Sequence, residues 1–214
     1  MLKLHGLVIS NYYNIVKLAL LEKGFDFEEV HAAPSQEESF LAISPMGKIP
    51  VLEAREGFLS ETSAILEFLE EINHEIPLLP EDHYARSKVR ELMKVFELYI
   101  DLAIRPHIGA VFGWHELDES RVPASRALLE QGLAAVERMT CFEPYLLGRE
   151  FSAADIYGYY TLDLAQVVAQ HIFEQDIYSS MPGLTQWRDK IAARPLTRKV
   201  DAAAAEARSK LAKT

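Results

Sequence analysis

The period of the hydrophobic pattern changes once along this 214-residue chain, and that change limits the possible folds more than any other feature. Over the first 75 residues, short apolar or alternating runs predict strands, and segments of helical spacing lie between them. The predicted strands lie near 2–9, 25–32, 49–54 and 58–60, and the helices near 14–23, 37–43 and 63–72. This order, β-α-β-α-β-β-α, predicts an α/β domain.

From Tyr84 onward every periodic segment is helical. The predicted helices span 84–115, 123–140, 152–170, 184–193 and 196–210. The first of them is expected to bend near Pro106 and Gly109. The stretch 73–82 contains Pro77 and Pro80 and shows no period, so its two leucines are expected to pack back onto a domain. The predicted organisation is an α/β domain over 1–75, a linker over 76–85 and an all-helical domain over 86–214.

Composition excludes several classes of function. The net charge of −10 argues against nucleic-acid binding, which depends on clustered lysine and arginine. Cys141 is the only cysteine, so an intramolecular disulfide, a CxxC pair and a cysteine-based zinc site are impossible. The histidines show no metal-ligand spacing, and no apolar run approaches the roughly 20 residues that span a bilayer. Lys3 and His5 interrupt the apolar N-terminal stretch, which argues against a signal peptide. We expect a cytoplasmic protein without a metal or a membrane partner.

Ser10 lies between the first predicted strand and the first predicted helix. The N–H groups in the first turn of a helix have no intrahelical partner, and with the helix dipole they attract an anion. A thiolate is stabilised there for the same reason. Serine and asparagine also commonly cap helices, so Ser10 and Asn11 leave an anion site and a simple cap both open.

Glu61 and Thr62 lie at the start of the helix predicted near residue 63. A hydroxyl and the first-turn N–H groups can hold a carboxylate, and Glu61 can accept an ammonium group. Together they would bind an α-amino-acid zwitterion. The alternative is that both residues serve only to start the helix.

The run SPMGKIPVL at 44–52 places a turn directly before a strand. Pro45 and Gly47 suit a turn, whereas Pro50 cannot donate to a sheet ladder. A cis bond at Pro50 would turn the N–H and C=O of Ile49 outward, where an extended peptide could pair with them.

The order of these three features resembles that of the cytosolic glutathione transferase family. The family motifs are a serine, cysteine or tyrosine between strand and helix, a G-K-[VI]-P turn and an E-S-x-A-I helix start. Here they are Ser10, GKIP at 47–50 and ETSAI at 61–65. The likeness includes FSAAD at 151–155, where Ser152 and Asp155 form a capping-box pattern that we interpret as a folding determinant. The resemblance implies a thioredoxin-like N-terminal domain, a helical C-terminal domain and glutathione as co-substrate.

The resemblance also implies roles for individual residues. Ser10 would be the catalytic residue, as in zeta-, theta- and omega-like members. The tyrosine-type members keep theirs about four residues earlier, where this chain has Gly6. The implied glutathione-binding residues are Lys48 for the glycyl carboxylate, Ile49 with Pro50 for the cysteinyl backbone, and Glu61 with Thr62 for the γ-glutamyl end.

The second substrate is expected between the domains. The candidate contacts are Tyr13, Tyr99, Arg105, His107, Phe112 and Trp114. The aromatic candidates are at helical spacing, which usually indicates inward packing. Arg105 and His107 flank Pro106 and suggest a contact with an anionic group.

The expected function is therefore conjugation of the glutathione thiolate to a small hydrophobic electrophile by a homodimer, a role in detoxification. One alternative is a zeta-like isomerase of a conjugated diacid, which Arg105 favours and the absence of a Ser-Ser-Cys motif disfavours. Another is a non-catalytic scaffold resembling stringent starvation protein A, although Glu61 and Thr62 would then have no purpose. Disulfide and dehydroascorbate reductases normally have a cysteine where this chain has Ser10.

Overall fold

The computed structural model describes residues 1–211, which form two compact units. The first unit contains Met1–Leu79 together with the described chain from Ala192 onward, and the second contains Pro80–Ile191. The predicted domains place everything after residue 86 in the helical domain. The structure differs because the last helix packs with the first unit.

The first unit is built on a four-stranded sheet with the order β2-β1-β3-β4. Its strands are β1 (Leu2–Gly6), β2 (Phe27–His31), β3 (Val51–Ala54) and β4 (Gly57–Leu59). Its helices are α1 (Asn11–Glu22), α2 (Glu38–Leu41), α3 (Thr62–Ile72) and α11 (Pro195–Leu211). β1 and β2 are parallel, and β3 is antiparallel to β1 and to β4. The predicted β-α-β-α-β-β-α order is confirmed.

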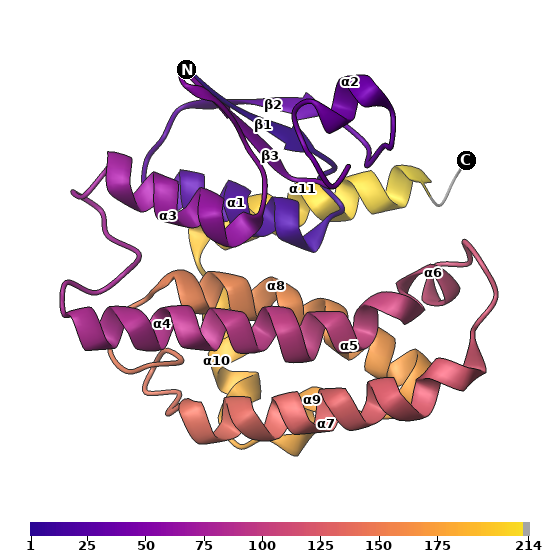
Figure 1. The fold of residues 1–214 in the computed structure, drawn as a ribbon. Coiled ribbons are helices and arrows are strands. Elements are labelled where there is room, and N and C mark those ends of the chain that lie inside the picture. Colours follow the sequence, from indigo (N-terminus) through magenta and orange to yellow (C-terminus); the bar gives the residue numbers. More distant parts are fainter. Residues whose placement is uncertain (212–214) are drawn as a thin grey trace. The chain divides into compact units, whose positions relative to one another are not determined.

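Helices α1 and α3 cover one face of this sheet, and α11 lies along α1 (Figure 1). Leu4 and Leu52 are paired across β1 and β3, and both are fully buried. Arg194, just before α11, donates from Nε and Nη2 to the two carboxylate oxygens of Glu22, at 3.1 and 2.8 Å. This bidentate ion pair attaches the start of α11 to the end of α1.

A buried ion pair fixes the chain after α3. Lys23 Nζ donates to Glu70 Oε2 and to the Ile76 carbonyl, both at 2.8 Å. The Glu70 carboxylate also accepts the N–H groups of Leu78 and Leu79. These two leucines are buried, so the prediction that they pack back onto a domain is confirmed.

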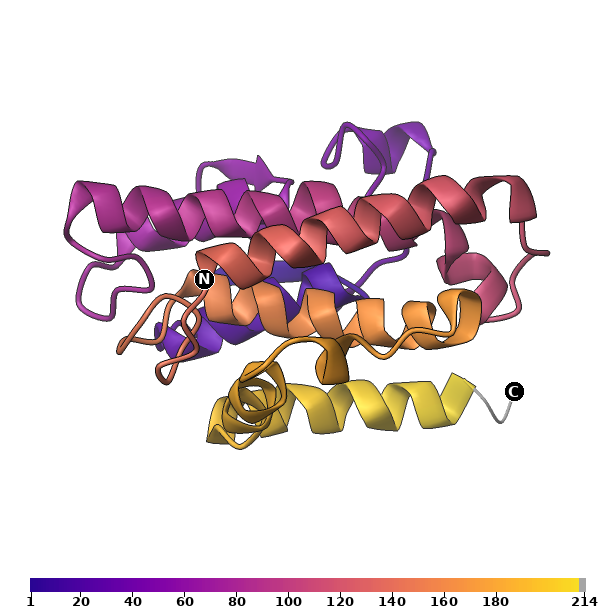
Figure 2. The same ribbon diagram turned by 90° about the horizontal axis from the view of Figure 1, so that it is seen from below.

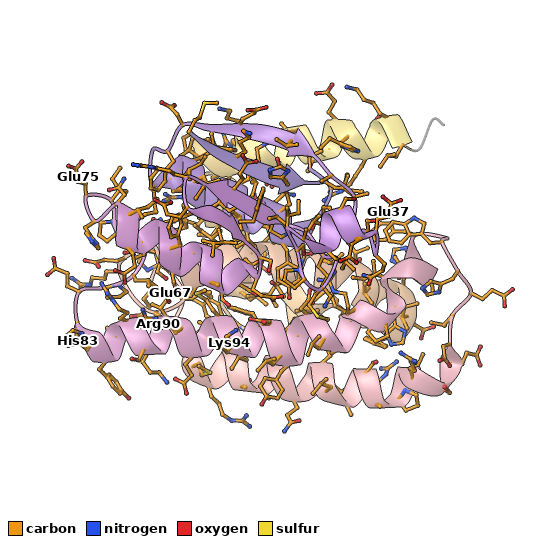
Figure 3. The ribbon with its side chains drawn as sticks, turned by 45° about the horizontal axis from the view of Figure 1, so that its top comes forward. Glu37, Glu67, Glu75, His83, Arg90 and Lys94 are labelled. Atoms are coloured by element: carbon orange, nitrogen blue, oxygen red, sulfur yellow. The ribbon has the colours of Figure 1, made fainter. Side chains whose placement is uncertain are left out.

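In the described chain, the regular elements of the second unit are all helices, apart from an isolated β-bridge between Tyr145 and Gly148. Its α-helices are α4 (His83–Val95), α5 (Leu102–Ile104), α6 (Ile108–Val111), α7 (Val122–Met139), α8 (Ala153–Val168), α9 (Ile177–Ser180) and α10 (Leu184–Ala192). Phe96–Asp101 and Ala169–Phe173 are π-helical, and Glu119–Arg121 forms a 3₁₀ turn. Figure 2 shows α7 and α8 beside the α4–α5 stretch. Lys94 lies in the last turn of α4 (Figure 3), and its Nζ donates to Glu97 Oε2 of the following π-helical segment at 2.7 Å.

The expected break near Pro106 is confirmed. A 3₁₀ turn, Arg105–His107, separates α5 from α6, because proline has no N–H to donate to the preceding turn. Within residues 1–211, no helix is long and apolar enough to cross a membrane.

The capping-box prediction at α8 is also confirmed. The fully buried Asp155 accepts the Ser152 N–H at 2.9 Å and closes the box. Its carboxylate also accepts the Leu146 N–H at 2.9 Å and the Trp187 indole N–H at 2.8 Å. One side chain thus holds together the loop before α8, the start of α8 and helix α10.

Candidate active site

Three predicted site segments meet at one edge of the sheet. Ser10 follows the carboxyl end of β1. Ile49 precedes β3, which runs antiparallel to β1 with Val51 opposite His5. Glu61 follows β4, which runs antiparallel to β3. The carboxyl ends of β1 and β4 and the amino end of β3 share this edge, so all three segments of the first unit lie there.

Ser10 is the N-cap of α1, with φ −78° and ψ 130°. Its Oγ accepts the Tyr13 N–H at 3.4 Å, which is long for a capping hydrogen bond. Helix α1 is further held by Asn14, whose Nδ2 donates to the Val8 carbonyl at 3.0 Å. The predicted location of Ser10 is confirmed. Because the cap uses a lone pair of Oγ, the hydroxyl proton stays available to donate to another group.

The turn before β3 is held by Ser44, whose role the sequence does not reveal. Ser44 is fully buried, and its Oγ accepts the Lys48 N–H at 3.0 Å and donates to the Lys48 carbonyl at 2.7 Å. Gly47 has φ 64°, and a Cβ there would lie 2.3 Å from the Ser35 carbonyl oxygen, so the turn requires glycine.

Directly after this turn, the Ile49–Pro50 peptide bond is cis. Within residues 1–211, the backbone N–H and C=O of Ile49 form no backbone hydrogen bond. Lys48 is exposed, and Pro50 is buried.

Glu61 has a backbone conformation that is unusual for its residue type. It is the N-cap of α3 with φ 66° and ψ 113°, and its side chain forms no capping hydrogen bond among the described residues. A non-glycine residue in the positive-φ region costs about 1–3 kcal/mol and is enriched at functional sites. Glu61 is exposed, whereas its neighbour Thr62 is buried. A purely capping role for the Glu61 carboxylate is therefore not supported.

Tyr13 does not fit the predicted contact with a second substrate. Its side chain is 1% exposed, and its hydroxyl donates to Glu29 Oε2 at 2.6 Å. Burial, followed by the hydrogen bond to Glu29, raises the pKa of Tyr13 far above its ordinary value. Tyr13 is thus a neutral core residue, which also argues against activation of a thiol by its hydroxyl. The sequence offered no signal for Glu29 as its partner.

The aromatic candidates in the second unit are exposed. Tyr99, Phe112 and Trp114 are 42%, 47% and 68% exposed. The rings of Phe112 and Trp114 stack with their centroids 5.6 Å apart. The alternative suggested by helical spacing, that these rings form the core of the helices, is wrong.

Arg105 and His107 do not supply free cations for an anionic group. Arg105 donates from Nε to Asp101 Oδ2 at 2.9 Å and from Nη2 to Asp101 Oδ1, and Asp101 is buried. His107 is 1% exposed, and neither ring nitrogen has a hydrogen-bond partner among the described residues. Burial, with a smaller effect from Arg121, lowers the pKa of His107. The interpretation of these two residues as an anion contact is not supported.

The buried His107 predicts a pH-dependent stability. Because its pKa is lowered on folding, the unfolded chain binds the proton more readily, and stability rises with pH up to about 6.5. We expect the free energy of unfolding to fall as the pH drops below about 6.5, and to fall less in His107→Phe. Urea unfolding between pH 5 and pH 8 measures this difference. An identical pH slope in His107→Phe would contradict the assignment.

Comparisons with known proteins agree with this architecture. The family model described as glutathione S-transferase, N-terminal domain, matches residues 4–77, and the C-terminal domain model matches residues 115–199. A glutathione S-transferase of Pseudomonas putida is 43% identical over 85% of this chain and 83% of its own length. A glutathione S-transferase structure from Rhodospirillum rubrum superposes with a TM-score of 0.77, at 26% identity, over 94% of this chain and 91% of that one.

One further relative was solved with a bound ligand, and two others have names that describe a different activity or role. A glutathione S-transferase from Methylobacterium radiotolerans, solved in complex with glutathione sulfonate, has a TM-score of 0.74 and 25% identity over 93% of both chains. A probable maleylacetoacetate isomerase of Drosophila melanogaster is 30% identical over 67% of this chain and 59% of its own length. A stringent starvation protein A homolog of Pasteurella multocida is 30% identical over 68% of this chain and 66% of its own length. The two family models and the Pseudomonas putida relative together establish that this chain belongs to the glutathione S-transferase family.

Proposed function

We propose that this protein conjugates the glutathione thiolate to a small hydrophobic electrophile. The observation that carries the proposal is the convergence of Ser10, Ile49 and Glu61 at one edge of the sheet. Each lies where a different part of an extended tripeptide can be held, and all three belong to the same compact unit. Ser10 can contact a thiol, the backbone of Ile49 can pair with a peptide, and Glu61 can accept an ammonium group. Glutathione carries all three of these groups.

The peptide is held by polar groups along this edge. Glu61 accepts the γ-glutamyl ammonium, while Thr62 and the N-terminus of α3 bind the γ-glutamyl carboxylate. The backbone of Ile49, beside Pro50, pairs with the cysteinyl residue as an added strand would. The exposed ammonium of Lys48 contacts the glycyl carboxylate.

Ser10 and the N-terminus of α1 stabilise the thiolate. The Ser10 hydroxyl donates a hydrogen bond to the sulfur, and the first-turn N–H groups add a positive potential. Lowering a thiol pKa from about 8.5 by two units corresponds to a stabilisation of the thiolate, relative to the thiol, by about 2.7 kcal/mol. The thiolate sulfur then attacks an electrophilic carbon, and the leaving group departs with the electron pair.

The exposed side chains of Tyr99, Phe112 and Trp114 provide apolar surface for the electrophile. A homodimer in the cytoplasm is the expected form of the protein, in keeping with the family.

An isomerase of a conjugated diacid is the second candidate, favoured by the likeness to the Drosophila melanogaster isomerase. The pairing of Arg105 with Asp101 weakens it, because that guanidinium is already engaged by a carboxylate. The scaffold alternative is favoured by the likeness to the stringent starvation protein A homolog. The strained backbone of Glu61 opposes it, because a scaffold has no use for a costly conformation at that position.

Replacing Glu61 with alanine tests the proposed binding mode. The wild-type protein is expected to bind immobilised glutathione at low salt. Glu61→Ala is expected to weaken glutathione binding by about ten- to a hundredfold, because the ammonium loses a charged hydrogen bond of roughly 1.5–3 kcal/mol. Isothermal titration calorimetry measures the affinity.

Glu56→Ala is the matched control for this experiment. Glu56 is an exposed glutamate of the same unit, in the β3–β4 hairpin at the opposite edge of the sheet. Its removal should leave the affinity unchanged. If Glu61→Ala lowered the free energy of unfolding by as much as it lowered the free energy of glutathione binding, Glu61 would be structural. A wild-type protein that did not bind glutathione would favour the scaffold.

A further inference from the structure

We propose that Glu29 of β2 is a positioning residue for the thiolate site: its carboxylate binds the first two turns of α1 through Tyr13 and Lys17, and so fixes Ser10. This inference rests on the proposed function and adds a residue that does not itself contact glutathione. Glu29 lies on a different element from Ser10, on the edge strand of the sheet.

The first observation is that one carboxylate oxygen accepts two donors from α1. Tyr13 Oη donates to Glu29 Oε2 at 2.6 Å, and Lys17 Nζ donates to the same oxygen at 2.7 Å. Tyr13 and Lys17 are four residues apart and therefore lie on the same face of the helix in successive turns. Both donor side chains are at least 94% buried, whereas the Glu29 side chain is 42% exposed, so the contact is shielded from water on the helix side.

The second observation is the fit of the Tyr13 ring over β1. A Cβ at position 6 would lie 2.5 Å from Tyr13 Cδ2, so the ring rests directly on the backbone of Gly6 at the end of β1. Leu4 of β1 pairs with Glu29 of β2, which places the Glu29 carboxylate on the same face of the sheet as α1. The ring is thus held between the strand that leads into Ser10 and the carboxylate that binds its hydroxyl.

The third observation links this cluster to Ser10. The backbone N–H of Tyr13 is the group that donates to Ser10 Oγ. A donor to the hydroxyl oxygen polarises the O–H bond and makes the hydroxyl a better donor to a thiolate. Any displacement of Tyr13 therefore alters both the cap and the hydrogen bond that Ser10 offers to the sulfur.

The charges of the cluster are balanced. Burial alone would raise the pKa of the Glu29 carboxyl, but the hydrogen bonds from Lys17 and Tyr13 hold it below its ordinary value. The carboxylate stays ionised at neutral pH, and the paired Lys17 ammonium offsets its charge. Lys199 of α11 adds a more distant positive charge.

Tyr13→Phe is the cleanest test, because it removes the hydroxyl and keeps the ring and every charge. In the free protein, we expect the first-turn amide protons of Tyr13 and Asn14, both of which donate to Ser10, to exchange faster by about three- to tenfold. With glutathione bound, we expect the thiol pKa to rise by about half a unit to one unit, which lowers the thiolate fraction by about three- to tenfold at a pH well below the thiol pKa. Glutathione affinity should change little, because Ile49, Glu61 and Thr62 hold the peptide.

Tyr178→Phe is the matched control. Tyr178 is a half-buried tyrosine of the second unit that also donates its hydroxyl to a carboxylate, that of Asp163, which is in turn paired with Arg188. The control should lose similar stability without a change in the exchange of α1 or in the thiol pKa. Glu29→Gln, which keeps an acceptor for Tyr13 but loses the ion pair with Lys17, should give a smaller exchange effect than Glu29→Ala.

The outcomes separate this inference from the proposed function. If the thiol of glutathione bound to the wild-type protein titrated with the same pKa as free glutathione, the proposed function would be refuted. A normal wild-type thiolate that titrates identically in Tyr13→Phe and Glu29→Ala would refute the positioning role alone. Unchanged first-turn exchange in both variants would also overturn it, whatever the chemistry of the site.

Discussion

Replacing Ser10 with alanine is expected to lower transfer activity at neutral pH by about ten- to a hundredfold. One hydrogen bond of about 1.5–3 kcal/mol from the hydroxyl to the charged sulfur is lost, and the thiol pKa rises accordingly. Glutathione affinity should stay nearly intact, because the peptide is held at Ile49, Glu61 and Thr62. Activity should partly return at alkaline pH, where the thiol ionises without help. Ultraviolet absorbance of the bound thiolate, titrated with pH, measures the shift directly.

Loss of a helix cap needs a control of its own, since Ser10 also caps α1. Asp82→Ala serves this purpose: Asp82 is the N-cap of α4, and its Oδ1 accepts the Ala85 N–H at 2.8 Å. This control should lower stability and leave the thiol pKa unchanged. An unaltered titration curve in Ser10→Ala would show that Ser10 is only a cap, and Asn11 or the backbone N–H groups would then activate the thiol.

The largest expected loss of stability follows from replacing Asp155 with alanine. The carboxylate accepts hydrogen bonds from the N–H groups of Leu146 and Ser152 and from the indole of Trp187, all in a fully buried environment. Removing it leaves these donors without a partner. We expect the free energy of unfolding to fall by about 3–5 kcal/mol. Urea denaturation followed by tryptophan fluorescence measures the loss.

Asp155→Asn provides the graded comparison. The amide oxygen can still accept from one set of donors, whereas the second position becomes an NH₂ group that faces the Ser152 N–H. The loss should therefore be smaller than for alanine. Equal losses in the two variants would mean that the carboxylate contributes through its charge and not through its separate acceptor oxygens. A loss below about 1 kcal/mol in Asp155→Ala would contradict its role as the folding determinant of this unit.

Much of the fold could be predicted because it depends on local patterns. The alternation of apolar residues and the position of Gly24 were enough to predict the first helix and the flanking strands. The capping box at Ser152 and Asp155 was predicted for the same reason, since both partners lie within one helical turn. The position of Ser10 also followed from neighbouring elements.

Most of the unpredicted features involve partners distant in sequence or backbone angles that residue type does not favour. Tyr13 and Glu29 meet only through the register of β1 with β2, so Tyr13 could not be recognised as a core residue from the sequence. The positive φ of Glu61 contradicts the usual preference of a glutamate. The exposure of Phe112 and Trp114 likewise contradicts the inward packing that helical spacing predicts.

The return of α11 to the first unit has a consequence for biosynthesis. Arg194 and Glu22 are 172 positions apart, so the ion pair between them forms only after nearly the whole chain has been translated. A ribosome releases the chain from its N-terminus, and domains generally fold as they emerge. The helical unit is therefore complete before the first unit, although it begins later. Until α11 emerges, the surface of α1 that it covers stays in water, so the first unit completes its packing as one of the last events of translation.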